Sequence, residues 1–296
     1  MTRMTVFTPS YNRKYCLHYL YQSLCTQSCQ DFLWLIVDDG STDNTQELVA
    51  EWIRENKIKI EYIYKENGGM HTAHNVAYDH ITTELNICID SDDRMAQGAI
   101  ESILKCWDQV KDNPKITGLV GLNVNLEGRV LGTQLPEDFK ITKFHHLYQK
   151  YGVKGDKKIV LRTSYINKKL RYPIFDGERL VPLSYLYYEL DKKYDYVYFN
   201  QIWANIDYQP DGSSATINKQ YFVSPRGFRF AKFNEYKQST VMLYRIRALI
   251  HYGFTSLILN DPLFFRKSPN PILSLMLYPF SMFFYLNKKI KFKKEI

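Results

Sequence analysis

Three carboxylates crowd the segment NICIDSDDRM at residues 86–95, namely Asp90, Asp92 and Asp93. Like charges this close repel one another and resist burial, so a positive charge is expected among them. Carboxylate oxygens suit a hard divalent cation that also takes oxygens from a diphosphate. The alternative is a solvated acidic turn in which Asp93 caps a helix beginning near Gln97. The cluster predicts a cation site, with the acidic turn left open.

A second acidic pair, Asp38 and Asp39, ends the apolar run FLWLIV at residues 32–37. Gly40 permits a tight turn, and residues 41–43 can cap the next helix. A carboxylate at such a strand end can accept a hydrogen bond from the imide N–H of uracil or thymine, or from a ribose hydroxyl. An Asx turn with an N-cap is the alternative, but it gives the doubled aspartate no role.

Strand-like and helical segments alternate in the first hundred residues, and this alternation would position both clusters. Strands are predicted over 4–8, 32–37, 58–64 and 85–90, and helices over 13–29, 43–56 and 72–80. Apolar strands separated by helices indicate a mainly parallel α/β sheet, whose ligands collect at the carboxyl ends of its strands. The clusters at these ends are residues 10–12, 38–41, 67–69 and 90–93.

The pattern loosens beyond residue 100. We expect a helix over 97–110, a strand over 118–124, strand-like segments over 158–163 and 196–200 around a helix over 185–193, and an amphipathic helix over 235–252. Strand 4–8 is expected to stop before Pro9. No internal repeat interrupts the chain.

Composition narrows the class of protein. The chain has 296 residues, 45% hydrophobic and 24% charged, which is typical of a globular protein with a real core. Its net charge is +8, but no basic stripe or nucleic-acid motif occurs, so we expect no nucleic-acid partner. Five cysteines without CxxC or zinc-type spacing predict reduced thiols, and the N-terminus shows no signal peptide. We expect a cytoplasmic protein.

The C-terminal segment ILSLMLYPFSMFFYL, residues 272–286, is almost entirely apolar. It is shorter than the roughly 20 residues of a transmembrane helix and contains Pro279. Residues 288–296 follow with five lysines and one glutamate. The segment therefore predicts either an interfacial anchor on an anionic membrane surface or a terminal helix docked on the protein's own core.

Four segments together resemble the nucleotide-sugar-binding half of the family 2 glycosyltransferases, which have the GT-A fold. They are TVFTPSYNR (5–13), VDDGSTD (37–43), NGGMHTAHN (67–75) and DSDD (90–93), and they cover about the first 95 residues. The resemblance implies an α/β GT-A type fold, a mainly parallel sheet flanked by helices, with a C-terminal helical membrane-associating extension. It implies a transferase domain over 1–232, divided into a nucleotide-binding half (1–95) and an acceptor half (96–232), and an extension over 233–296.

The same resemblance implies roles for the residues of the first two clusters. Pro9 and Tyr11 are similar to residues that line and stack on a uracil-type base. Asp39 is similar to the carboxylate that binds the N–H of the base, with Asp38 as its neighbour.

For the acidic cluster, the resemblance implies a metal and a sugar contact. Asp93 is similar to the ligand of Mn²⁺ or Mg²⁺ on the diphosphate. Asp92 is similar to the residue that faces the sugar and ribose, beside the same ion.

The NGGMHTAHN segment departs from the common family pattern, because His74 occupies the place of an arginine. Gly68 and Gly69 would let the backbone pass close to the ligand, and the helix after them can face phosphate together with Asn75. His71 and His74 could donate to phosphate or a hydroxyl, form a zinc pair, or be buried structural residues. All three alternatives stay open.

An inverting transfer needs a base for the acceptor hydroxyl. The family supplies an acidic residue after the loop-rich region, and FDGERLVP at residues 175–182 is similar to that stretch. Glu178 is the first candidate and Asp176 the second. The expected second acid is replaced by Arg179. A cap or a surface residue is the alternative for Glu178.

The resemblance as a whole implies an inverting, metal-dependent transferase. It would move a sugar from a UDP-sugar to a glycan or lipid-diphosphate-linked acceptor in bacterial capsule or surface polysaccharide synthesis, at the inner face of the membrane. One alternative is a nucleotidyltransferase, which would show a glycine-rich basic loop after the first strand, and TPSYNRKY has none. The other is a non-catalytic nucleotide- or glycan-binding member, in which the metal motif would be damaged.

Overall fold

The structure is a computed structural model that describes residues 2–136, 141–166, 170–209, 212, 216–261 and 263–294, without the side chains of residues 293 and 294. The chain divides into two compact units. Unit 1 comprises Met1–Arg171 and Lys193–Tyr208, and unit 2 comprises Tyr172–Lys192 and Gln209–Ile296. The sequence-based boundary at residue 232 falls inside helix α8 (Pro225–Gln238) and matches the border of neither unit.

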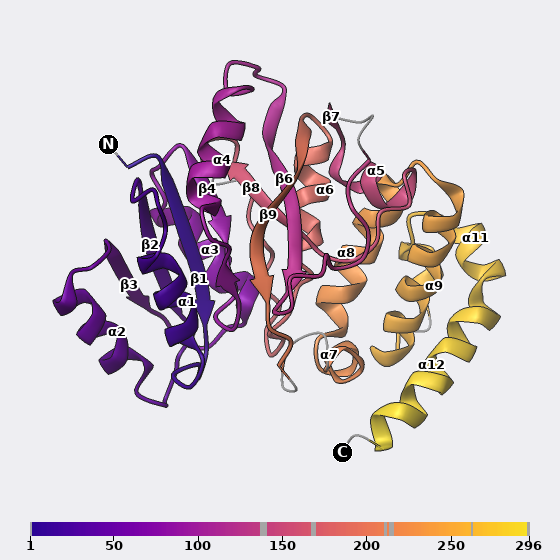
Figure 1. Ribbon diagram of the computed structural model, residues 1–296. Helices are drawn as coiled ribbons and strands as arrows, with labels where there is room; N and C mark the ends of the chain where they lie inside the picture. The colour runs from indigo at the N-terminus through magenta and orange to yellow at the C-terminus, as the bar shows by residue number, and fades with distance from the viewer. Residues whose placement is uncertain are drawn as a thin grey trace. The chain divides into compact units, whose positions relative to one another are not determined.

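Unit 1 is built on a mixed sheet that has nine strands among the described residues, in the order β3-β2-β1-β4-β8-β6-β9-β5 with β7 beside β9 (Figure 1). Strands β3, β2, β1 and β4 are mutually parallel, while β8 runs antiparallel to both β4 and β6. The predicted α/β fold with a mostly parallel sheet is confirmed. The strands are β1 (Met4–Ser10), β2 (Phe32–Asp38), β3 (Ile60–Tyr64), β4 (Leu85–Cys88), β5 (Arg94–Met95), β6 (Ile116–Asn125), β7 (Ile141–Thr142), β8 (Lys157–Arg162) and β9 (Asp195–Ile206).

Helices cover both faces of this sheet, as the alternation of side chains along β1 requires. Val6 belongs to the core cluster that includes Leu20 of α1 and Trp107 of α4. The next residue, Phe7, points to the other face and meets His74 of α3 edge to face at 4.9 Å. The helical elements of unit 1 are α1 (Leu17–Cys25), α2 (Thr45–Glu55), α3 (Met70–His80), α4 (Ala99–Asp108), α5 (Phe144–Gln149) and the 3₁₀ turn η1 (Thr163–Tyr165).

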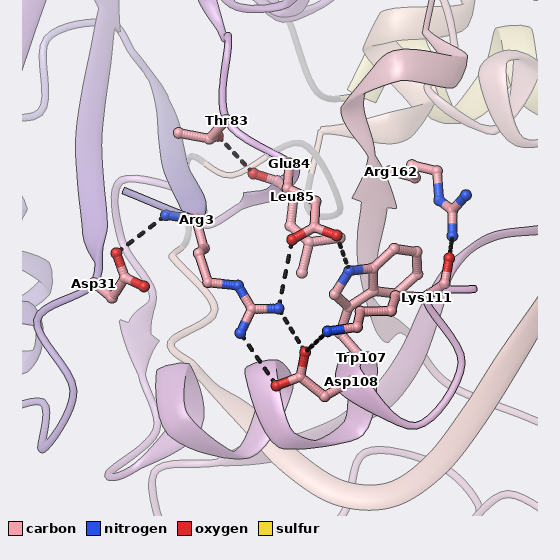
Figure 2. Close-up of polar contacts among 9 residues, drawn as sticks. All are labelled: Arg3, Asp31, Thr83, Glu84, Leu85, Trp107, Asp108, Lys111 and Arg162. Carbon is pink, nitrogen blue, oxygen red and sulfur yellow. Dashed lines mark hydrogen bonds and ion pairs between the residues drawn. The ribbon is translucent and has the colours of Figure 1, made fainter. Parts of the chain in front are cut away.

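A polar network joins the amino-terminal ends of two central strands, β1 and β4 (Figure 2). The Arg3 guanidinium, just before β1, donates to both Asp108 oxygens at 3.1 and 2.7 Å and to Glu84 at 3.4 Å. Glu84, just before β4, accepts from Trp107 Nε1 at 2.6 Å. This network joins the starts of β1 and β4 to the end of α4. The carboxyl ends of the strands, at the opposite side of the sheet, take no part in it.

Strand β1 continues through Pro9, two residues beyond its expected end. Pro9 lies opposite Val37 of β2, and Ser10 lies opposite Asp38. The pairing of β1 with β4 already ends at Phe7, so the missing N–H of Pro9 takes no bond from that ladder. The expectation that Pro9 stops the strand was wrong, because Pro9 lies beyond the end of the β4 ladder and still pairs with β2.

Unit 2 is helical in its described residues. The single helix expected over 235–252 was wrong, because α8 ends at Gln238 and α9 begins at Met242. The break, residues 239–241, reads Ser-Thr-Val, which are hydroxyl and β-branched residues with low helix propensity. The helices of unit 2 are α6 (Ser184–Asp191), α7 (Ile217–Val223), α8, α9 (Met242–Ile258), α10 (Phe264–Lys267), α11 (Pro271–Met276) and α12 (Tyr278–Lys294).

The apolar segment 272–286 is divided between α11 and α12, with Leu277 between them. Pro279 is the second residue of α12, where a missing N–H takes no bond from the helix. Within the described part of the chain, we find no helix that combines the length and the apolar character needed to cross a bilayer.

Candidate functional site

The loops that follow β1 and β2 are tied together. Because Ser10 and Asp38 are in register, the chain leaves both strands at the same edge of the sheet. The backbone N–H of Asn12 donates to Ser41 Oγ at 2.8 Å, and Asn12 Oδ1 accepts from the Thr42 N–H at 2.8 Å. Tyr11, the residue before Asn12, exposes 46% of its surface. The structure therefore brings the first two clusters together and leaves the Tyr11 ring accessible.

Asp38 is fully buried and holds the second turn. Its Oδ1 accepts from the Ser41 N–H at 2.7 Å, and its Oδ2 accepts from the Tyr62 hydroxyl at 2.6 Å. Burial, and then the Asp38 carboxylate, raises the pKa of Tyr62, so the phenol stays protonated and keeps donating. These contacts give the first aspartate of the pair a structural role, and its predicted place beside a nucleotide base stays a prediction.

Asp39 joins the second cluster to the glycine turn. Its Oδ1 accepts from the Gly68 N–H at 2.9 Å and from the Lys65 ammonium, and its Oδ2 accepts from the Gly69 N–H at 2.7 Å. Gly40 permits this approach: it has a φ of +87°, and a Cβ there would lie 2.9 Å from the backbone N of Asn67. Asp39 therefore organises the turn that was predicted to pass a ligand, and its binding of the base N–H stays a prediction.

His74 lies in the core beneath β1 and is 1% exposed. Its Nδ1 is 3.3 Å from the Tyr78 hydroxyl, and its Nε2 is 3.6 Å from Cys88 Sγ. Burial, and then neighbouring His71, lowers the pKa of His74 to about 3, so the imidazole is neutral near pH 7. A neutral ring does not replace the positive charge of an arginine. The contacts of His74 favour the structural alternative, and His71 is equally buried.

The acidic cluster forms a turn after β4 that is fastened to β9. The Asp93 N–H donates to the Asp90 carbonyl at 3.0 Å. Asp93 Oδ1 accepts from the Asp207 N–H at 3.2 Å, and Oδ2 lies 3.6 Å from the Lys158 ammonium. Asp93 is 3% exposed, whereas Asp92 is half-buried.

The positive charge expected among these carboxylates is provided in part by Lys158 of β8. Burial raises the pKa of Asp93 to about 7, Lys158 opposes that rise, and Asp90 and Asp92 add to it. Burial alone would lower the pKa of Lys158, but Asp93 and Asp90 together raise it, so Lys158 is an ammonium. Lys158 has no distinguishing signal in the sequence, because a lysine opening a strand-like run is ordinarily a surface residue.

The chemistry of the acidic cluster still fits a divalent cation. Among the residues that the structure describes, no three His, Cys, Asp or Glu side chains are grouped to hold a metal ion by themselves. Mg²⁺ and Mn²⁺ are commonly bound by one or two carboxylates, with waters and substrate phosphates completing the shell. Asp92 and Asp93 provide two carboxylates of the required kind.

The two candidate bases lie in unit 2. Glu178 is 8% exposed, and its carboxylate lies at the amino-terminal end of α8. Its Oε1 accepts from Arg226 N at 2.9 Å and Nε at 3.0 Å, and its Oε2 accepts from Gly227 N at 2.8 Å. The Asp176 side chain is exposed, and its backbone carbonyl accepts from Arg226. Glu178 is therefore held as a cap of α8, and a catalytic role for either acid stays a prediction.

Comparison with known proteins places this geometry in a family context. The chain is 33% identical over 106 residues to the teichoic acid poly(glycerol phosphate) polymerase of Staphylococcus epidermidis. The matched region covers 36% of this chain and 15% of that protein. It is also 24% identical over 181 residues to the GalNAc(5)-diNAcBac-PP-undecaprenol beta-1,3-glucosyltransferase of Campylobacter jejuni. Here the matched region covers 60% of this chain and 58% of that protein. The chain thus matches between about one seventh and three fifths of these relatives.

A solved structure supports the same fold. The crystal structure of S. aureus TarS 1–349 in complex with UDP-GlcNAc superimposes with a TM-score of 0.63 at 16% identity, over 97% of this chain and 79% of that one. The sequence model of the family described as Glycosyl transferase family 2 matches residues 5–166, which is more than half of the chain and includes all four strand-end clusters. The chain belongs to Glycosyl transferase family 2.

Proposed function

We propose that this chain transfers a sugar, with inversion, from a UDP-sugar to a hydroxyl group of a bacterial surface glycan or of its lipid-diphosphate-linked precursor. One observation carries the proposal furthest: Asp39 binds the Gly68 and Gly69 amides, so the second and third strand-end clusters form one structure beside an exposed Tyr11. Such an edge offers an aromatic face for a base and a close backbone approach for a phosphate.

The diphosphate end of the donor is assigned to the acidic cluster. Asp93, with Asp92, would hold Mn²⁺ or Mg²⁺ together with diphosphate oxygens. When bound, the ion would neutralise charge on the departing nucleoside diphosphate. Lys158 keeps a second positive charge 3.6 Å from Asp93 Oδ2 and so favours the ionised carboxylate.

The acceptor hydroxyl needs a proton acceptor as it attacks the anomeric carbon. We assign this role to Glu178 or Asp176. Glu178 is fixed in place by the α8 amides, which suits a base that must hold its orientation, while exposed Asp176 is free to meet solvent and substrate.

The relatives support a surface-glycan substrate. Their names include a teichoic acid polymerase and a glucosyltransferase acting on an undecaprenol-linked glycan, and TarS was solved with UDP-GlcNAc. Because this chain matches only part of the relatives' length, the donor and the acceptor are proposed for it and not transferred from them.

The test is a donor screen with the purified chain. UDP-, GDP- and dTDP-sugars are each added with Mn²⁺ or with EDTA, and the melting temperature and slow donor hydrolysis are measured. A UDP-sugar should raise the melting temperature and be hydrolysed only with the metal, and Asp93→Asn should lose the metal-dependent part. Stabilisation by every nucleotide sugar equally, or equal hydrolysis in EDTA, would contradict the assignment.

The same assay separates the alternatives. A nucleotidyltransferase would release pyrophosphate from a nucleoside triphosphate and a sugar phosphate. A non-catalytic member would bind the UDP-sugar without turning it over, even when glycan or lipid-linked acceptors are supplied.

A further inference from the structure

Helices α11 and α12 expose six large apolar side chains, which we call the outer apolar face. Each member exposes between 51 and 71% of its surface, far more than a core residue. Within α12, the spacing of three or four residues places the four members from 280 to 290 along one side of the helix, and the two members in α11 are four residues apart. The members are Ile272, Met276, Phe280, Phe283, Leu286 and Ile290.

The opposite side of α12 is packed within unit 2. Ser281 is 1% exposed and lies against Gly253 of α9, where an added Cβ would come within 2.4 Å of Ser281 Oγ. Phe284 meets the His251 ring at 4.6 Å, and Phe292 stacks on Phe222 of α7 at 4.5 Å. The inner side of the helix is therefore already used, and the outer apolar face belongs to a helix that is held in place.

The charge of the chain is concentrated in the same region. Residues 236–296 contain ten Lys or Arg and two Asp or Glu, a net charge of +8, which equals the net charge of the whole chain. No acidic residue occurs between Asp261 and Glu295. Asp261 itself is paired with Arg229 at 3.0 Å and Lys267 at 3.3 Å. The outer apolar face is thus continued by uncompensated lysines, of which Lys289 and Lys291 are exposed.

We propose that the outer apolar face lies in the headgroup region of an anionic lipid bilayer, with the lysines of α12 against the lipid phosphates. A helix of this composition buries its apolar side about 5–10 Å into the interface, and nearby basic residues add electrostatic attraction. A second copy of this chain is the less suitable occupant, because it would bring two strongly basic segments together. An anionic surface satisfies the apolar and the basic residues at once.

This inference refines the two alternatives that sequence analysis left open. One side of α12 docks on α9 and α7, as a terminal helix would, while the other side is free to bind lipid, as an interfacial anchor would. It rests on unit 2 alone and does not depend on the transfer reaction, so it can fail while the proposed function stands, and the reverse.

The test is sedimentation of the full chain with vesicles of phosphatidylcholine alone or with 25% phosphatidylglycerol. The wild-type chain should bind the anionic vesicles at least tenfold more tightly, and binding should weaken with added salt. Phe280→Gln/Phe283→Gln/Ile290→Gln should abolish measurable binding. Lys289→Gln/Lys291→Gln should weaken it by about 30-fold, since each lysine near the surface contributes about 1 kcal/mol.

A matched control uses exposed apolar residues of unit 1. Ile53→Gln/Leu126→Gln/Ile141→Gln should bind vesicles like the wild type, and all variants should keep its melting temperature. Wild-type protein that stays in the supernatant with anionic vesicles overturns the proposal. A folded triple α12 variant that still binds the vesicles also overturns it. The face would instead be a dimer interface if neither protein bound vesicles and sedimentation equilibrium showed a dimer for the wild type but not for the triple variant.

Discussion

The ammonium of Lys158 on β8 lies 3.6 Å from Asp93 Oδ2, and both side chains are almost completely buried. The crowded carboxylates after β4 therefore have a cation from their own chain before any ion or substrate arrives. Because the attraction between the two is opposed by the cost of burying them, their charges are sensitive to pH.

Replacing Lys158 by Met should make the protein more sensitive to alkaline pH. Without the ammonium, buried Asp93 resists ionisation more strongly, since an opposite charge ordinarily lowers a carboxyl pKa by 1–3 units. The loss of unfolding free energy between pH 5 and pH 8 should exceed that of the wild type by about 1 kcal/mol, because the wild-type carboxyl already loses most of what a single group can lose over three pH units. Urea denaturation at the two pH values measures it. Lys105→Met, at a 73% exposed lysine side chain, is the control and should leave the pH dependence unchanged.

Asp93→Asn should have the opposite effect. The pKa of Asp93 is raised to about 7 in the folded protein, so its contribution to stability is complete below its ordinary value of 3.8 and is lost as the pH rises through 7. The asparagine side chain of the variant cannot ionise, so the variant does not lose unfolding free energy in this way. Relative to the wild type, its unfolding free energy should rise by on the order of 2 to 4 kcal/mol between pH 4 and pH 8. Parallel curves for the two proteins would show that Asp93 ionises freely.

Asp39→Asn should loosen the glycine turn. The substitution removes the charge from both hydrogen bonds and turns an amide donor toward one of the two backbone N–H groups, which costs about 1–3 kcal/mol. Hydrogen exchange at the Gly68 and Gly69 amides should accelerate, and UDP affinity measured by calorimetry should fall. Glu66→Gln changes an exposed carboxylate on the same turn and should affect neither. Unchanged exchange in Asp39→Asn would show that the turn holds itself.

Glu178→Gln and Asp176→Asn should separate catalysis from capping. Glu178 accepts from two backbone N–H groups, so its amide variant must lower the melting temperature whatever its catalytic role. Turnover per folded molecule is therefore the decisive quantity. It should fall by at least 100-fold for the variant that removes the base and stay near wild type for the other. Full turnover in both folded variants would exclude both residues as the base.

Much of unit 1 could be predicted because its signals are local. Each of the parallel strands combines an apolar run with turn residues at its end, and neighbouring parallel strands necessarily bring those ends to one edge. The Asp38–Asp39 pair and the glycine turn were found in this way. Their contact through Asp39 was not, because a hydrogen bond across 29 residues leaves no periodic signal.

The remaining features depend on contacts that are distant in sequence. Lys158 meets Asp93 from a strand that runs antiparallel to its neighbours, and Glu178 caps a helix that begins almost 50 residues later. The break between α8 and α9 was hidden because apolar spacing continues across it. Burial, which makes His74 neutral, is likewise a property of the packed core and not of the HTAHN segment.

Unit 2 is assembled from two stretches of chain, and β9 of unit 1 is made between them. The first stretch supplies α6 and Glu178, and the second supplies α8. From α8, the Gly227 N–H donates to Glu178 and the Gln238 side-chain amide donates to Glu189 at 3.0 Å. No single cut of the polypeptide can therefore release this unit whole. A shortened chain ending at Tyr208 would leave Glu178 and Glu189 without these α8 donors. The C-terminal helices are therefore needed to complete unit 2 and cannot be removed without disrupting it.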